Sequence, residues 1–327
     1  MPDRIVLPVF VCLWSSGYVV GALAIEVADP LPVLVGRFAL AALVAVPLAL
    51  ARGRWRGAPL GRLAVIGLLL QVVQFGGIYG GFALGVPAAL SALVMLGLSP
   101  LVTTGLAVAS RQERGSARVW GGLAVGVAGV GISLAPELGS ARVGAGVALT
   151  LIALLGLAGG TVLQKRWVAD ADPPVTVAVQ SVTALAVAAP VLAVAGGHVD
   201  WSPQLVLSVA WLAWVMGVLS LLTMVYVLGR HAASSVAALL LLVPPVTAAM
   251  GALVLGDALH VASLAGMVVA LVGVGAVLRR AQTARRPASA LPSVTSSAYS
   301  RSEPTGSPDA SRVMVTSGDC ACRASAR

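Results

Sequence analysis

The sequence has 327 residues, of which 58% are hydrophobic and only 10% are charged, and its mean hydropathy is +0.97. A soluble globular domain usually carries about 25% charged residues, so this composition excludes a compact water-soluble fold and indicates an integral membrane protein. The net charge of +9 comes from 21 Lys and Arg residues that lie almost wholly in short gaps between apolar runs. The charge therefore reflects membrane topology, and no nucleic-acid partner is expected.

Neither metal nor nucleotide chemistry is indicated by the sequence. Cys12 lies in the first apolar run, and Cys320 and Cys322 lie in a polar tail with no second cluster of Cys or His. The single lysine, Lys165, follows Gln164 and not the glycine of a phosphate-binding loop. We therefore expect no metal and no other cofactor.

Ten apolar runs of 18 to 24 residues predict an all-α membrane protein with ten transmembrane helices. Each run is close to the roughly 20 residues that a helix needs to cross the hydrocarbon layer, and breakers such as Asp29-Pro30 and Gly196-Gly197 separate the runs. The predicted spans are 5–24, 32–50, 63–84, 87–109, 118–135, 143–164, 175–195, 205–228, 234–255 and 261–278.

The basic residues predict the orientation of the spans. With a cytoplasmic N-terminus, 19 of the 21 Lys and Arg residues fall on the inner side, which leaves Arg142 outside and Arg37 within a span. Trp55, Trp120 and Trp167 then lie at inner boundaries. We expect a multi-pass protein of the cytoplasmic (inner) membrane with both termini in the cytoplasm.

The sequences near the two ends of the chain need separate interpretation. Ala22-Leu23-Ala24 resembles a signal-peptide cleavage site, but the apolar run before it is longer than a usual signal core and only Arg4 precedes it. Residues 281–327 are rich in Ser, Pro, Arg and Thr and have no apolar periodicity, which predicts a disordered cytoplasmic tail.

An internal duplication is visible when the chain is compared with itself at an offset of 144 residues. Unusual residues then coincide: Pro100 with Pro244, Glu113 with Asp257, Gly122 with Gly266, Gly129 with Gly273, and Gly131 with Gly275. This predicts two five-helix repeats, residues 1–137 and 138–280, followed by the tail. Because five is odd, the second repeat enters the membrane from the opposite side. This arrangement is associated with alternating access. The alternative is that the duplication reflects gene history alone and gives a static bundle.

Three groups of residues in these spans form recognisable motifs: the run Leu13–Val19, then Pro32 with the run Val35–Ala42, and finally Leu242–Val246 with Gly256-Asp257. These motifs resemble those of the EamA family of the drug/metabolite transporter (DMT) superfamily. The resemblance covers about residues 5–278 and implies ten helices and the export or exchange of small metabolites, often amino acids or related compounds, without bound ATP. Asp257 stands where the family more often has Glu, and Glu113 lies between arginines instead of following Gly.

Three polar residues near mid-depth are candidates for substrate binding. Trp14 and Gln74 lie about 14–17 Å from the inner boundary at 1.5 Å per residue, and Gln71 is placed one turn below Gln74 on the same helix face. Such side chains could hydrogen-bond a polar solute without the desolvation cost of a charge. The alternative is that they join neighbouring helices.

Arg37 is the one charged residue within a predicted span, roughly 8 Å from its outer end. It could pair with a substrate carboxylate, or it could extend to the outer headgroups. The acidic residues, in contrast, all lie in loops, at helix ends or in the tail, so a proton relay through a buried carboxylate is not evident.

Five further residues are candidates for conformational change. Pro100, Pro244 and Pro245 interrupt equivalent helices and could act as hinges, although static kinks are an equal alternative. Tyr79 and Tyr226 lie near opposite membrane faces, where they could form gates or anchor the interface.

These features predict a non-enzymatic secondary transporter that moves a small polar metabolite, by efflux, through alternating access, acting alone or as a homodimer. One alternative is an intramembrane enzyme using Ser99 or Ser133, but His198, His231 and His260 all lie in or beside loops, so no nucleophile and base share a depth. The other alternative is a structural or signalling bundle that does not transport.

Overall fold

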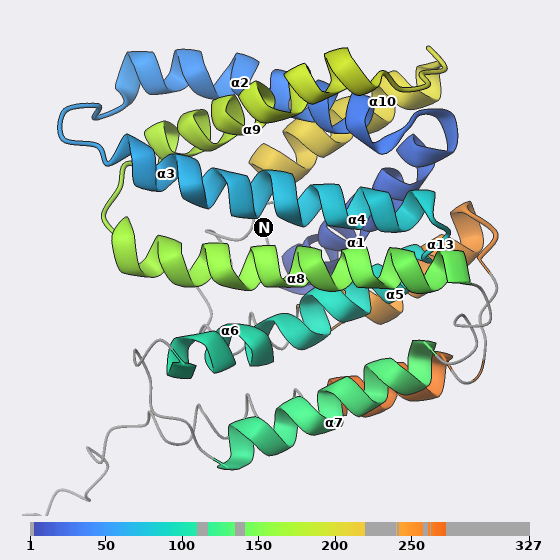
Figure 1. Ribbon diagram of the computed structural model, residues 1–327. Coiled ribbons are helices and arrows are strands. Elements are labelled where there is room, and N and C mark those ends of the chain that lie inside the picture. Colours follow the sequence, from blue (N-terminus) through green and yellow to red (C-terminus); the bar gives the residue numbers. More distant parts are fainter. Residues whose placement is uncertain are drawn as a thin grey trace, which may run out of the picture. The chain divides into compact units, whose positions relative to one another are not determined.

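The computed structural model describes residues 3–109, 117–134, 141–219, 242–257 and 263–272, together with residues 240 and 261. These residues form an all-helical fold (Figure 1), and the bridge between Ala28 and Val199 is the only β-type pairing among them. Tyr226 and the predicted tail lie outside the described residues. The helices are α1 (Asp3–Val27), α2 (Pro30–Arg52), α3 (Leu60–Gly67), η1 (Leu68–Val73), α4 (Gln74–Ala83), α5 (Ala88–Ala92), η2 (Leu93–Gly97), α6 (Leu98–Ala109), α7 (Ala117–Leu134), α8 (Ala141–Trp167), α9 (Pro173–Ala195), α10 (Pro203–Ala210), η3 (Trp211–Leu219) and α13 (Val243–Val254), with a further helical segment at 263–272.

Five helices in the described part of the chain are long and apolar enough to cross a membrane, and five more apolar helices are shorter. The long ones correspond to the predicted spans 5–24, 32–50, 63–84, 143–164 and 175–195, with ends that differ by a few residues. The shorter helices overlap the other five predicted runs, and only Pro203–Gly217 begins before its run, by two residues.

Large apolar side chains on the outer faces of these helices are exposed. Leu43 and Leu50 on α2, Val194 on α9 and Leu207 on α10 are 65–91% exposed. A soluble protein rarely presents so much contiguous apolar surface, whereas a lipid-facing helix does so without cost. The fold is therefore that of a multi-pass membrane protein.

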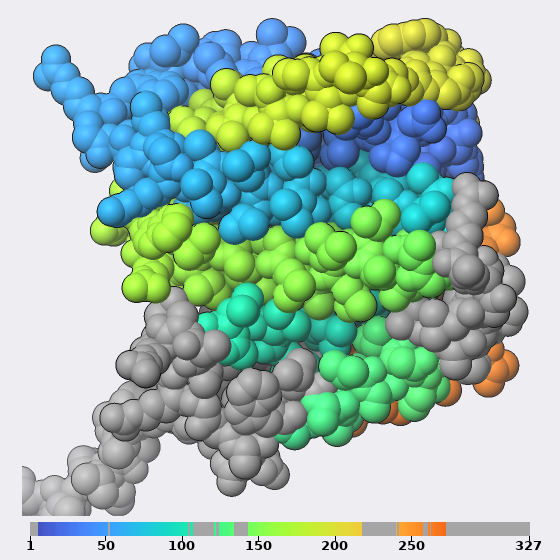
Figure 2. Space-filling view, viewed as in Figure 1, coloured from blue at the N-terminus to red at the C-terminus, as the bar shows by residue number. Residues whose placement is uncertain are grey.

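Glycines bring α4 and α8 into close contact. A Cβ atom at Gly81 would lie 2.7 Å from Thr150 Oγ1, and one at Gly77 would collide with the carbonyl oxygen of Leu149. Helices that lack a hydrophobic driving force in lipid pack through such small residues. Figure 2 shows α8 lying directly against the continuous α3–η1–α4 segment.

The antiparallel pair α2 and α9 shows the same sequence pattern in both members. Each helix is preceded by an Asp and starts with Pro, has an interior Pro 17 residues after that first Pro, and is followed by Gly. The matching residues are 143 apart: Asp29 with Asp172, Pro30 with Pro173, Pro47 with Pro190, and Gly53 with Gly196.

Each end of the α2–α9 pair is closed by an aspartate of one helix and a backbone amide of the other. Asp29 Oδ2 accepts a hydrogen bond from the backbone N of His198 at 2.7 Å, and Asp172 Oδ2 accepts one from the backbone N of Arg54 at 3.0 Å. Neither carboxylate caps its own helix. We call these two contacts the end clamps of α2 and α9.

The end clamps predict matched effects of two substitutions. Asp29→Ala or Asp172→Ala should each lower the free energy of unfolding by about 1 kcal/mol, because a solvent-exposed hydrogen bond to a carboxylate is lost. Thermal unfolding of the detergent-solubilised protein would measure the change. Asp170→Ala, at an exposed position in the same loop as Asp172, is the control. Equal melting temperatures for all three variants would contradict a stabilising role.

Candidate functional site

A cavity of about 220 Å³ lies among α1, α2, η2, α4, α8 and η3. Its wall is largely apolar, with polar groups from three helices. The lining residues are Trp14, Gly17, Tyr18, Arg37, Gln74, Phe75, Ile78, Tyr79, Leu96, Leu157, Leu212 and Met216.

Arg37 contributes the only formal charge among these lining residues. Its Nη1 donates a hydrogen bond to the Tyr79 hydroxyl at 2.6 Å, and its Cζ lies 3.6 Å from the centre of the Phe75 ring. The guanidinium is therefore fixed between one hydroxyl and one aromatic face. Cation–π attraction strengthens in a desolvated setting, so Phe75 compensates part of the cost of holding this charge away from water.

The aromatic residues on α4 are held in place by their own packing. Tyr79 is almost fully buried, and its ring lies 6.1 Å from that of Phe82 in a stacked arrangement and 6.1 Å from that of Phe75 in a tilted one. A Cβ atom at Gly21 of α1 would lie 3.1–3.2 Å from Tyr79 and Phe82. The glycine thus lets α1 approach the aromatic row that positions Arg37.

Two neutral polar groups complete the cavity. Trp14 Nε1 is buried and has no hydrogen-bond partner among the described residues. Gln74 makes no side-chain hydrogen bond to that part of the chain either. A buried donor without a partner costs free energy, so the cavity holds polar capacity that the described protein does not use.

Gln71, in contrast, is not part of the cavity lining. It lies in η1, a π-helical segment that ends just before Gln74. A π-helix has about 4.4 residues per turn and an α-helix 3.6, so three residues no longer bring two side chains to the same face. The structure therefore separates the two glutamines that an ideal α-helix places together.

Each of the three described π-helical segments adjoins the cavity. Gln74 directly follows η1, Leu96 lies in η2, and Leu212 and Met216 lie in η3. The segments η1 and η3 begin 143 residues apart, at Leu68 and Trp211. π-Turns inside helices occur frequently at functional sites, because they redirect side chains and loosen backbone pairing.

The prolines predicted as hinges lie outside the cavity. Pro100 is the third residue of α6, directly after η2, and Pro244 and Pro245 occupy the first turn of α13. A proline in a first turn costs no hydrogen bond within the helix. The Ser15 hydroxyl lies 3.2 Å from the Val243 carbonyl oxygen and so links α1 to the start of α13.

The sequence gives no signal for several residues of the cavity wall. Each lies within a continuous apolar run and looks like an ordinary residue of a span: Phe75, Leu96, Leu157, Leu212 and Met216. The Ser16 hydroxyl accepts a hydrogen bond from Trp211 Nε1 at 3.1 Å and ties α1 to η3. For Ser16, Gly17 and Tyr18 the sequence does hold a signal, since all three belong to the motif in Leu13–Val19.

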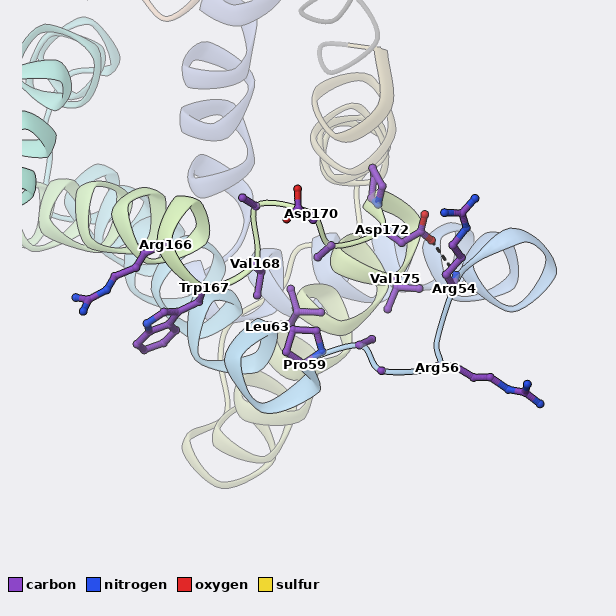
Figure 3. A pocket seen from close by; sticks show the side chains of 15 residues that line it. Arg54, Arg56, Pro59, Leu63, Arg166, Trp167, Val168, Asp170, Asp172 and Val175 are labelled. Atoms are coloured by element: carbon purple, nitrogen blue, oxygen red, sulfur yellow. Dashed lines mark hydrogen bonds between the residues drawn. The ribbon is translucent and has the colours of Figure 1, made fainter. Parts of the chain in front are cut away.

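A second cavity, of about 560 Å³, lies between the α2–α3 and α8–α9 loops (Figure 3). Arg54, Arg56 and Arg166 belong to its lining, but Figure 3 shows their guanidinium groups pointing in different directions, away from a common centre. This arrangement does not form a converging anion site. The Asp172 end clamp lies at its edge.

The fold and the first cavity together define a class: a multi-pass helical membrane protein with a chamber inside the bundle whose apolar wall carries a few polar groups. Comparison with known proteins adds a family match for part of the chain. Residues 144–279 match the sequence model of the EamA-like transporter family, so this part carries an EamA-like domain, consistent with the EamA family of the DMT superfamily. This family is one of transporters.

Solved structures support the fold independently. One of them, described only as "Crystal structure of protein", is 18% identical, has a TM-score of 0.58, and aligns over 86% of this chain and 98% of its own. At that identity the similarity concerns the fold alone. No curated protein matches the chain.

A larger residue at Gly17 would test whether the cavity binds a solute. An alanine there would place its Cβ 2.6 Å from the Met216 methyl carbon, so Met216 must move within the cavity that both residues line. We expect Gly17→Ala to weaken solute binding about tenfold, since overpacking costs on the order of 1–3 kcal/mol. Binding titrations on the purified protein would measure this.

Gly131→Ala is the matched control for this test, because a Cβ on that helical glycine meets nothing within 4 Å. In the double variant Gly17→Ala with Met216→Ala, affinity should recover in part. Unchanged affinity in Gly17→Ala would mean that solute binds elsewhere.

Proposed function

We propose that the protein is a secondary transporter that moves a small polar metabolite, an amino acid or related compound, across the cytoplasmic membrane by alternating access. The observation that carries the proposal is the chamber in which Trp14, Arg37, Gln74 and Tyr79 meet among otherwise apolar helices. Polar and charged side chains inside a membrane bundle carry a free-energy cost, which a polar solute bound to them would offset.

The repeated features of the two halves support alternating access. The shared Asp, Pro and Gly pattern, the paired end clamps and the spacing of η1 and η3 all recur at 143 or 144 residues. Two five-helix repeats of opposite orientation would account for them, and such repeats exchange inward-open and outward-open shapes around a midplane site.

The proposal includes a direction and an orientation. The basic residues of the inner segments favour cytoplasmic termini, and the family resemblance favours export. Action as a monomer or as a homodimer is compatible with the chamber, since its wall comes from one chain.

An intramembrane hydrolase is the weaker alternative. The Ser133 hydroxyl donates to the carbonyl oxygen of Ser263, and the Ser263 hydroxyl donates back to the carbonyl oxygen of Ser133 at 3.1 Å. Both hydroxyls thus join two helices, and neither is poised as a nucleophile.

Transport can be tested with the purified full-length chain in liposomes. We expect saturable counterflow of at least one labelled amino acid or related metabolite. Gln74→Leu should raise the half-saturation concentration about tenfold, because a hydrogen bond to the solute is lost, whereas Gln71→Leu, outside the cavity, should leave it unchanged. Equal effects of the two substitutions would place the solute elsewhere, and the absence of flux would refute the transport proposal.

The orientation can be tested separately. Reporter fusions at residue 2 and after residue 280 should both report a cytoplasmic location, because five spans per repeat and ten in total return the chain to its starting side. Fusions on opposite sides would rule out paired five-helix repeats.

A further inference from the structure

The charge balance of the cavity points to the chemical class of the cargo, and this inference rests on the proposed transport function. Arg37 is the eighth residue of α2, between Gly36 and Phe38, and so lies roughly 10–12 Å into the helix. A guanidinium at that depth requires compensation. Its partners in the structure, the Tyr79 hydroxyl and the Phe75 ring, are both neutral.

Among the described residues, no carboxylate lines the cavity. The acidic residues in the described part of the chain all lie at helix ends or in loops: Asp3, Glu26, Asp29, Asp170, Asp172, Asp200 and Asp257. The cationic charge of Arg37 therefore has no anionic counterpart from that part of the protein. We propose that the cargo supplies it, and that the transporter carries a small organic anion, a carboxylate joined to an apolar body.

The geometry of Arg37 suits a carboxylate. Phe75 holds the guanidinium over its ring, and among the described residues only Nη1 has a hydrogen-bond partner, the Tyr79 hydroxyl, so the remaining N–H groups can donate to a ligand. An oriented guanidinium fork matches the two oxygens of a carboxylate, which a lysine ammonium cannot do.

The other lining residues indicate the chemistry of the rest of the cargo molecule. Ile78, Leu96, Leu157 and Leu212 present an apolar surface to its body, while Trp14 Nε1 offers a further donor. A solute that carries only a positive charge would be repelled by Arg37, because it has no carboxylate to pair with the guanidinium. The cavity thus favours carboxylate-bearing solutes, amino acids included, over simple amines.

Binding of three solutes with one carbon skeleton tests this inference. The probes are 4-methylpentanoate, 4-methylpentanamide and 4-methylpentylamine, which are anionic, neutral and cationic at pH 7. Isothermal titration of the full chain in lipid nanodiscs avoids their passive permeation. The acid should bind about tenfold or more tightly than the amide, since a charge-assisted hydrogen bond is about twice as strong as a neutral one, and the amine should be the weakest.

Substitutions at Arg37 separate recognition from folding. Arg37→Gln should abolish the preference for the acid over the amide, and Arg37→Lys should keep part of it because the charge remains. A purely structural role would not produce this graded change in charge preference. Arg62→Gln, at an exposed arginine outside the cavity, is the control and should behave as the unsubstituted protein.

The possible failures are distinguishable. Equal affinity of the unsubstituted protein for acid and amide would overturn the anion preference and leave transport standing. No binding of any probe, together with no flux of any metabolite in liposomes, would overturn the transport proposal itself.

Discussion

The free-energy cost of one guanidinium inside apolar helices is the constraint around which the chamber is organised. Arg37 needs a ring to stack on and an oxygen to donate to, and α4 provides both through Phe75 and Tyr79, which lie one turn apart. Tyr79 and its neighbour Phe82 in turn need space on α1, which Gly21 leaves. Gly21 of α1 and Arg37 of α2 are thus coupled physically through Tyr79 of α4, because the hydroxyl that Arg37 uses belongs to a ring that requires a small residue on α1.

Much of the fold follows from continuous apolar runs, because in lipid the backbone must satisfy its own hydrogen bonds and a long apolar run therefore becomes a helix. Small residues also leave room for neighbouring helices to approach, and α8 packs closely against Gly77 and Gly81 of α4. The sequence does not reveal which residues share one face of a helix where the helix departs from α-helical geometry. The π-helical segment η1 has no proline or glycine among residues 68–73 to mark it in the sequence. An ideal α-helix would place Gln71 and Gln74 on one face, whereas in the structure Gln74 lines the cavity and Gln71 does not.

The end clamps show a second limit of sequence reasoning. Asp29 and Asp172 were recognisable only as loop residues before proline, where aspartate is common. Their partners are backbone amides 169 and 118 residues away in the chain, and any residue type could supply those amides. Only the three-dimensional pairing reveals that each aspartate joins α2 to α9, and only then does the 143-residue match between the two helices acquire a physical reason.

The matched helices also show where the two halves of the chain differ. The eighth residue of α9, 143 positions after Arg37, is Gln180, which is buried with its Nε2 3.5 Å from Gln164 Oε1. The equivalent positions therefore carry a charge on α2 and a neutral amide on α9. Because α2 and α9 are antiparallel, these positions lie toward opposite ends of the pair. A carrier built this way would hold an anion more strongly toward one membrane face than the other, so an imbalance in affinity would arise at this one pair of matched positions.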